Sequence, residues 1–193
     1  NIEIVGSAGS AFEAEKKIKE LSPDVVTMDV EMPDMKGTDF LKELIPKNPL
    51  PVVLVSSLNI GIFEALSAGA VDYVKKPNIQ SSSDFTIFCR ELSVKIKIAS
   101  SAKVKKSVAP TASLPLPVLN HSGTSENIIA IGASTGGTEA TLEVLKQLPA
   151  NIPGILIVQH MPAGFTKMYA DRLNRICNFS DLEAQNGDRV KQG

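Results

Sequence analysis

The sequence has little of several features that would place it in a specialised class of protein. It contains two cysteines, Cys89 and Cys177, which lie far apart, and its 20 basic and 21 acidic side chains leave a net charge of −1. Two distant cysteines do not build a disulfide scaffold and fit a reducing cytoplasm, so we expect a cytoplasmic protein. The balanced charge gives no reason to expect nucleic acid or an acidic membrane as partner. No run of about 18 apolar residues occurs, so we expect no insertion into a membrane.

What the sequence does contain is a regular alternation of strand-like and helix-like segments. Within residues 1–99, apolar strand-like runs occupy residues 2–5, 25–30, 51–56 and 71–74. Helical periodicity occupies residues 12–21, a segment after the expected N-cap Thr38, residues 62–68 before Gly69, and the stripe from Phe85 to Ile96. Such alternation predicts an α/β fold with a parallel sheet that helices cover on both faces.

A change of composition divides the chain. Residues 100–125 are rich in Ser, Ala, Pro and Lys without a persistent period, which predicts a linker. A second α/β pattern follows in residues 126–193, with strands at 128–131 and 155–158, helices at 137–148 and 165–176, and a turn at Asn186 and Gly187. We therefore expect two domains, residues 1–99 and 126–193, joined by residues 100–125.

Three polar residues follow successive predicted strands of the first domain. Asp29 ends the second strand-like run, Ser56 ends the third, and Lys76 follows the fourth. Ligands of open α/β sheets gather at the carboxyl ends of the strands, and a carboxylate, a hydroxyl and a lysine suit a phosphoryl-transfer site. The alternative interpretation makes Asp29 a turn or capping acid and Lys76 a surface lysine.

In these motifs the first domain resembles the response-regulator receiver domain, which has a flavodoxin-like fold. The resemblance is carried by "MDVEMPDMKG", "VSS" and "DYVKKP". It implies that Asp29 accepts a phosphoryl group, that Ser56, Tyr73 and Lys76 serve as switch and phosphate-binding residues, and that Asp29 and the backbone carbonyl of Glu31 bind Mg²⁺. The family's first strand and its acidic pair have no counterpart here, so we expect this chain to be truncated at its N-terminus.

The segment "GASTG", residues 132–136, matches the G-x-S-x-G pattern of a nucleophile elbow. Glycines allow the sharp turn that exposes Ser134, and the following helix directs its N-terminal amides at the same place. His160 ends the next strand, and strands about 4.8 Å apart can bring a serine and an imidazole together. The alternatives are a structural glycine turn and a phosphate-binding loop, although the lysine of a P-loop is absent.

This second domain resembles the catalytic domain of the chemotaxis protein-glutamate methylesterases, a Rossmann-like doubly wound α/β fold. The similar segments are "IGASTGGTEA", "VQHMPAGFT" and "NGDRVKQG". The resemblance implies Ser134 as nucleophile and His160 as general base, and it puts the triad aspartate beyond residue 193, since Asp171, Asp181 and Asp188 lie outside the matching motif. We therefore expect a chain that lacks both ends of the enzyme and is inactive by itself.

Together the two resemblances imply a phosphorylation-activated hydrolase of chemotaxis. Its expected partners are a histidine kinase, which phosphorylates Asp29 with Mg²⁺, and chemoreceptors whose glutamate methyl esters it hydrolyses and whose glutamines it deamidates. The esterase reaction itself is expected to need no cofactor. The alternative function is a response regulator with a non-catalytic protein-binding output. A DNA-binding output is disfavoured because no helix-turn-helix with a basic face is visible.

Overall fold

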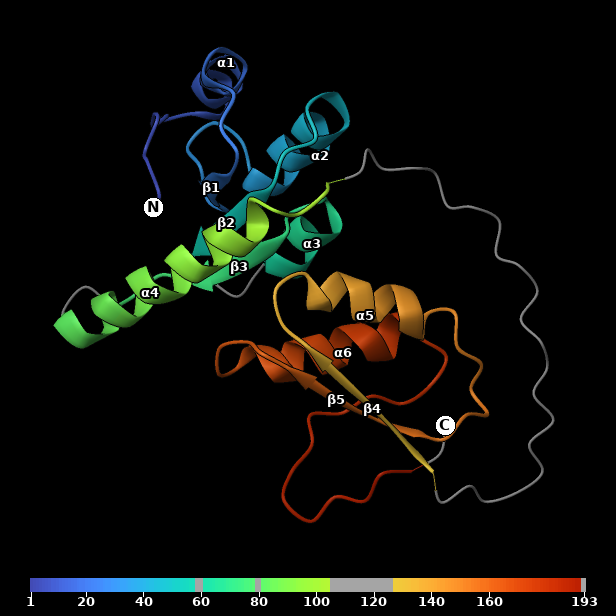
Figure 1. Ribbon diagram of the computed structural model, residues 1–193. Coiled ribbons are helices and arrows are strands. Elements are labelled where there is room, and N and C mark those ends of the chain that lie inside the picture. Colours follow the sequence, from blue (N-terminus) through green and yellow to red (C-terminus); the bar gives the residue numbers. More distant parts are fainter. Residues whose placement is uncertain (58–60, 79–80, 105–126, 192–193) are drawn as a thin grey trace. The chain divides into compact units, whose positions relative to one another are not determined.

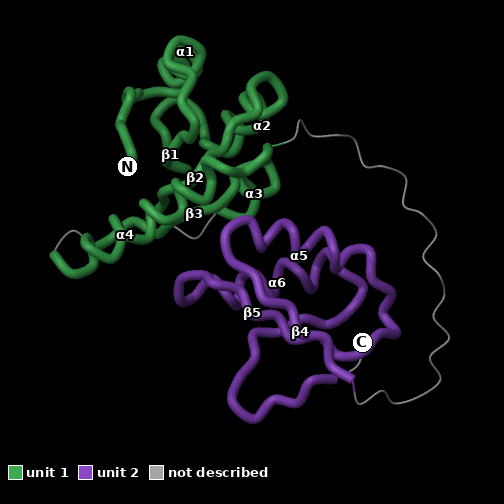
Figure 2. The backbone as a smooth tube through the Cα atoms, in the orientation of Figure 1, with its two compact units in different colours: residues 1–108 green, residues 109–193 purple. Residues whose placement is uncertain are grey.

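The structure is a computed structural model that describes residues 1–57, 61–78, 81–104 and 127–191. The chain forms two compact units, residues 1–108 and residues 109–193 (Figure 2). Most of the expected linker, residues 105–126, lies outside the described residues, so the domain boundaries stay a prediction. Each unit is described by itself below.

The first unit is a parallel α/β structure (Figure 1). Its three strands lie in the order β1-β2-β3, with Val26 opposite Val52 and Val53 opposite Asp72. The strands are β1 (Val26–Asp29), β2 (Val52–Ser56) and β3 (Asp72–Lys75), and the helices are α1 (Ala11–Leu21), α2 (Gly37–Lys47), α3 (Ile62–Ser67) and α4 (Ser82–Ala99). The predicted alternation of parallel strands and helices is confirmed.

The central strand β2 is buried on both faces. Val53 and Leu54 are 0% exposed, and because successive side chains of a strand point to opposite faces, both faces of β2 are covered. On one face Val53 packs with Val74 of β3 and Ala99 of α4. This arrangement confirms the prediction of a covered parallel sheet.

The predicted strand at residues 2–5 is not formed. These residues have no regular secondary structure, and Ile4 is 87% exposed. A strand needs a neighbour for its backbone hydrogen bonds, and the sheet of the described residues consists of β1, β2 and β3. In a flavodoxin-like order this segment is adjacent to none of these three strands. The β-branched pattern alone was therefore an insufficient signal.

The expected N-cap at Thr38 is also wrong. Helix α2 begins at Gly37, the preceding Lys36 occupies the cap position without a side-chain hydrogen bond, and Thr38 is buried in the first turn. The backbone N–H of Gly37 instead donates to the carbonyl of Val30 at 2.9 Å. A Cβ at Gly37 would lie 2.7 Å from the Asp29 carbonyl, so the absence of a side chain lets the helix start against the end of β1.

The second unit pairs two parallel strands and carries two helices (Figure 1). The elements are β4 (Ile128–Ala133), α5 (Gly137–Leu145), β5 (Gly154–Gln159) and α6 (Phe165–Ile176), and α5 ends three residues before the predicted end. The predicted turn is present, with Gly187 at φ 95°. The exposure of β5 alternates, because Leu156 and Val158 are exposed while their neighbours are half-buried. In the described part of this unit, the sheet is therefore covered on one face.

Helix α6 is tied to the first turn of α5 by an ion pair whose arginine is buried. Arg172, which is 6% exposed, donates to both carboxylate oxygens of Glu139 at 2.7 and 3.2 Å. The hydroxyl of Tyr169 also donates to the backbone carbonyl of Thr138 at 3.0 Å. A buried guanidinium is tolerated when a bidentate carboxylate meets it, so this pair fixes the start of α5.

Asp181 makes the stability of the second unit depend on pH. Burial raises the pKa of its carboxyl to about 6, and its buried Oδ2 has no hydrogen-bond partner among the described residues. Because the folded pKa lies above the unfolded value of about 3.9, stability is full below pH 4 and falls as pH rises toward 6.

We expect Asp181→Asn to remove this loss, because a neutral amide carries no desolvated charge. At pH 7.5 the variant should be more stable by about 1 kcal/mol, a value reduced for the partial exposure of the group. Urea unfolding followed through the NMR signal of Tyr169 measures the effect. Asp171→Asn, at an exposed position of α6, is the control. Equal pH profiles of the Asp181→Asn and wild-type proteins would contradict this account.

Candidate functional site

The carboxyl ends of the three strands of the first unit bring Asp29, Ser56 and Lys76 together. Asp29 ends β1, Ser56 ends β2, and Lys76 follows β3. The ammonium of Lys76 forms an ion pair with Oδ2 of Asp29, and the backbone N–H of Lys76 donates to the carbonyl of Ser56 at 2.9 Å. About a third of each charged side chain is exposed, 38% for Lys76 and 33% for Asp29, so the pair is accessible from solvent. This is the grouping that the sequence predicts, and the roles of its members stay predictions.

Asp29 and Glu31 supply the kind of oxygen that Mg²⁺ prefers. The backbone N–H of Glu31 donates to Oδ1 of Asp29 at 3.2 Å, so the Asp29 carboxylate and the Glu31 backbone lie next to each other. Across the described ranges, no group of three or more His, Cys, Asp or Glu side chains could hold a metal ion. Mg²⁺ keeps several waters and is usually held by one or two carboxylates together with phosphate oxygens. One carboxylate and one carbonyl therefore fit Mg²⁺ as part of its ligand set.

Tyr73, the predicted switch aromatic, lies buried on β3 beside a lysine that the sequence analysis missed. Tyr73 is 2% exposed, and burial, followed by the charge of Asp72, raises the pKa of its phenol. The ammonium of Lys95, on α4, donates to the Tyr73 carbonyl at 2.6 Å and to Oδ1 of Asp72 at 3.2 Å, and lies 5.2 Å from the centre of the Tyr73 ring. Glu91 adds a second carboxylate at 3.1 Å. Lys95 thus ties α4 to the strand that leads to Lys76.

We expect Lys95→Met to destabilise the first unit by about 3–5 kcal/mol, because it leaves the buried Asp72 without its cation. The double variant Lys95→Met with Asp72→Asn should recover part of this loss. Unfolding in urea, followed through the NMR signal of Tyr73, measures both. Lys97→Met, at an exposed position of the same helix, is the matched control. A Lys95→Met protein as stable as this control would show that the buried pair does not hold α4.

Ser134 and His160 lie at adjacent strand ends of the second unit. Ser134 occupies the turn between β4 and α5, where its carbonyl accepts the N–H of Gly137 at 2.8 Å. His160 directly follows β5, and its backbone N–H donates to the carbonyl of Ala133 at 3.0 Å. Both side chains are exposed, and among the described residues no hydrogen bond joins the hydroxyl of Ser134 to the imidazole. The backbone places the two residues at adjacent strand ends, and their pairing as nucleophile and base stays a prediction. Such side-chain contacts often tighten only when substrate binds.

Two glycines make the turn after Ser134 possible. Gly136 has φ 74°, in the left-handed region that favours glycine. A Cβ on Gly137 would lie 2.6 Å from Cβ of Ala133 and 2.5 Å from the side-chain oxygen of Gln159. Helix α5 consequently starts close to the strand ends, with its first amides near Ser134, where a helix N-terminus favours negative charge.

Gln159 is a second residue that the sequence analysis missed. It ends β5, and its side-chain amide donates to the carbonyl of Ser134 at 2.8 Å and to the carbonyl of His160 at 3.3 Å. Its place beside His160 in "VQHMPAGFT" was the available signal.

In the described part of the structure, no hydrogen bond or ion pair joins His160 to any of the three aspartates near the end of the chain. Asp171 pairs with Lys167 on α6 at 3.7 Å. The backbone N–H of Asp181 donates to Asn174 at 3.3 Å, and Oδ2 of Asp188 accepts the N–H of Gln185 at 2.7 Å. The structure therefore assigns no triad carboxylate within the described residues.

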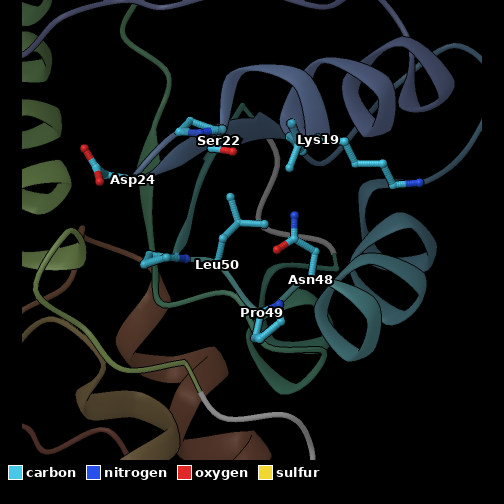
Figure 3. Close-up of a pocket in the computed structure, with 9 residues that line it drawn as sticks. Lys19, Ser22, Asp24, Asn48, Pro49 and Leu50 are labelled. Carbon is cyan, nitrogen blue, oxygen red and sulfur yellow. The ribbon is translucent and has the colours of Figure 1, made fainter.

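A hollow in the first unit lies away from these residues (Figure 3). Its volume is about 480 Å³, and the residues that line it include Lys19, Ser22, Asp24, Asn48, Pro49 and Leu50. Asp24 and Leu50 precede β1 and β2, so the hollow lies at the amino ends of the strands, opposite to Asp29. It takes no part in the candidate sites. No helix in the described ranges has both the length and the apolar character needed to cross a membrane.

Comparison with known proteins gives a match for each unit. Residues 1–83 match the family model of the response regulator receiver domain, and residues 129–193 match that of the CheB methylesterase. All of the chain aligns with the protein-glutamate methylesterase/protein-glutamine glutaminase of Syntrophotalea carbinolica, at 46% identity over 57% of that protein. All of it also aligns with the protein of the same name from Salmonella typhimurium, at 42% identity over 56% of that protein. The chain thus spans little more than half the length of these relatives.

Two solved structures from Thermotoga maritima are also similar. The response regulator domain of CheB is 41% identical, with a TM-score of 0.47 over 52% of this chain and 78% of that one. The CheB methylesterase catalytic domain is 43% identical, with a TM-score of 0.34 over 36% of this chain and 37% of that one.

Proposed function

Because this chain belongs to the family of chemotaxis response regulators that are protein-glutamate methylesterases, we propose that the protein is a phosphorylation-activated hydrolase of chemoreceptors. The observation that carries the proposal is the placement of Ser134 and His160 at adjacent strand ends of a unit that matches the methylesterase model. The same chain carries the Asp29–Lys76 pair in a unit that matches the receiver model. The methylesterase match argues against an output that only binds protein or DNA.

The proposed reaction is hydrolysis of a glutamate methyl ester through an acyl-enzyme. Oγ of Ser134 attacks the ester carbonyl carbon while His160 takes the hydroxyl proton. The amides at the start of α5 stabilise the negative oxygen of the tetrahedral intermediate. Methanol leaves with the proton from His160, and a water activated by His160 then releases the glutamate and regenerates Ser134. A glutamine side chain follows the same steps and releases ammonia, in agreement with the names of the relatives.

The proposed control of this reaction is phosphorylation of Asp29 by a histidine kinase. The Asp29 carboxylate attacks the phosphorus of the kinase's phosphohistidine, the P–N bond breaks and the histidine leaves, and Lys76 and Ser56 then hold oxygens of the new acyl phosphate. A Mg²⁺ ion bound by Asp29 and the Glu31 carbonyl would offset the negative charge of the phosphoryl group. Tyr73, which lies on β3 three residues before Lys76, reports the change to the surface of the receiver unit.

Ser134→Ala should abolish methanol release, because it removes the hydroxyl oxygen that forms the acyl-enzyme in the proposed reaction. The assay uses a chimaera in which this chain replaces the matching 56% of the Salmonella typhimurium relative, with receptor membranes that carry labelled methyl esters. We expect a fall in turnover of more than about 10³-fold. Ser180→Ala, at an exposed position of the same unit, should keep the wild-type rate. Retained activity of the Ser134→Ala chimaera would remove Ser134 as nucleophile.

Asp29→Asn should prevent formation of an acyl phosphate, because an amide does not attack phosphorus as a carboxylate does. The measurement is incorporation of labelled phosphate from a small-molecule phosphodonor into the same chimaera in the presence of Mg²⁺. Asp34→Asn, at an exposed position of the loop that follows β1, is the control and should be labelled like the wild type. If the Asp29→Asn chimaera incorporates as much phosphate as this control, Asp29 is not the acceptor.

A further inference from the structure

The side chain of Gln159 connects the two turns that carry Ser134 and His160. Its Nε2 lies 2.8 Å from the carbonyl oxygen of Ser134 and 3.3 Å from that of His160. Both neighbours are hydrogen-bond acceptors, so the NH₂ group, and not the amide oxygen, has to face them. One side chain therefore holds the backbone at both proposed catalytic residues.

The other end of the same amide packs against the start of α5. The oxygen of Gln159 is buried and has no hydrogen-bond partner among the described residues. A Cβ on Gly137 would lie only 2.5 Å from this oxygen. The amide thus fills the space that Gly137 leaves open, and it touches the strand ends, the Ser134 turn and the first residue of α5 together.

Stability alone does not account for a glutamine at this position. A buried amide oxygen without a partner is a cost in folding free energy, and an apolar side chain of similar length would avoid it. What an apolar side chain could not do is donate to the two carbonyls. The specific contribution of Gln159 is consequently the pair of bonds that spans Ser134 and His160.

We propose that Gln159 is a positioning residue for the Ser134–His160 pair. Since no hydrogen bond joins the two side chains in the described residues, the backbone of the two turns sets their separation. Gln159 fixes the peptide after Ser134, and hence the direction of its hydroxyl, relative to the backbone of His160. This inference rests on the proposed function only where it concerns the reactivity of Ser134. The two hydrogen bonds of the Gln159 side chain are observed in the structure whatever the function.

The test compares Gln159→Met, which keeps the length of the side chain and removes its donor, with the matched control Gln147→Met. Gln147, which lies just after α5, donates to the carbonyl of Glu143 at 2.9 Å at an exposed position, so the control removes the same kind of bond away from the turn. The first readout, on this chain, is the NMR signal of the Gln159 NH₂ group and of the backbone amides of Ser134, Gly137 and His160. The second, on the chimaera used for the Ser134→Ala test, is the rate at which a fluorophosphonate labels Ser134 between pH 5 and 9, with the unfolding temperature measured alongside.

We expect Gln159→Met to shift the three backbone signals and to lower the labelling rate by about 10- to 100-fold across the pH range, because a misplaced nucleophile reacts slowly. Gln147→Met should change neither. The inference is overturned if Gln159→Met leaves the signals and the labelling rate as in the wild type, or if it lowers only the unfolding temperature. If the wild-type chain shows a protected Gln159 NH₂ group and Gln159→Met shifts the backbone signals, but Ser134 of the wild-type chimaera is not labelled, the proposed function is contradicted while the two hydrogen bonds of Gln159 are established.

Discussion

Parallel pairing of neighbouring strands decides where the chemistry of both units lies. In the first unit, Asp29 stands opposite Val55 and Ser56 stands opposite Lys75, so the residues that end the three strands meet at one edge of the sheet. In the second unit, Ala133 stands opposite Gln159, which puts the turns that follow β4 and β5 next to each other. Backbone hydrogen bonds extend this pairing by one residue in each case, from Lys76 to Ser56 and from His160 to Ala133. The strand register, which backbone hydrogen bonds define, is thus enough to place the backbone of the candidate residues.

In each unit, a buried cationic side chain on the last helix stabilises the arrangement of the strand ends. Lys95 of α4 binds Asp72 and the carbonyl of Tyr73, and Arg172 of α6 binds Glu139 in the first turn of α5. In both units the helix is thereby fixed to an element that leads directly into or out of the candidate site. Removing one member of such a pair leaves a buried charge without its partner. Its loss therefore costs more folding free energy than the loss of an exposed ion pair on a helix surface.

Local periodicity was sufficient to predict most elements, and it failed where a distant partner decides the outcome. Helix α6 was predicted with its observed bounds because apolar residues recur at helical spacing from Phe165 to Ile176. Residues 2–5 carry a good strand pattern and remain irregular, since a strand forms only beside a neighbour. Thr38 looked like a cap, yet the backbone of Val30 holds the start of α2.

The residues of the candidate sites also fall into those that the sequence could predict and those that it could not. Asp29, Ser56, Lys76, Ser134 and His160 were predictable because each follows a strand-like run. The hydrogen bonds of Lys95 and Gln159 were not predictable, because their partners lie 23 and 25 residues away in the sequence and only the folded structure brings them together.

The claim on which the account depends is that Ser134 forms a covalent intermediate with its substrate. The most direct measurement is an acid quench of the chimaera during turnover of a glutamate methyl ester peptide, followed by mass spectrometry of its proteolytic peptides. The account predicts one peptide whose mass rises by that of the acyl group, with the added mass on Ser134. Turnover that proceeds with no adduct, or with the adduct on another residue, would contradict it.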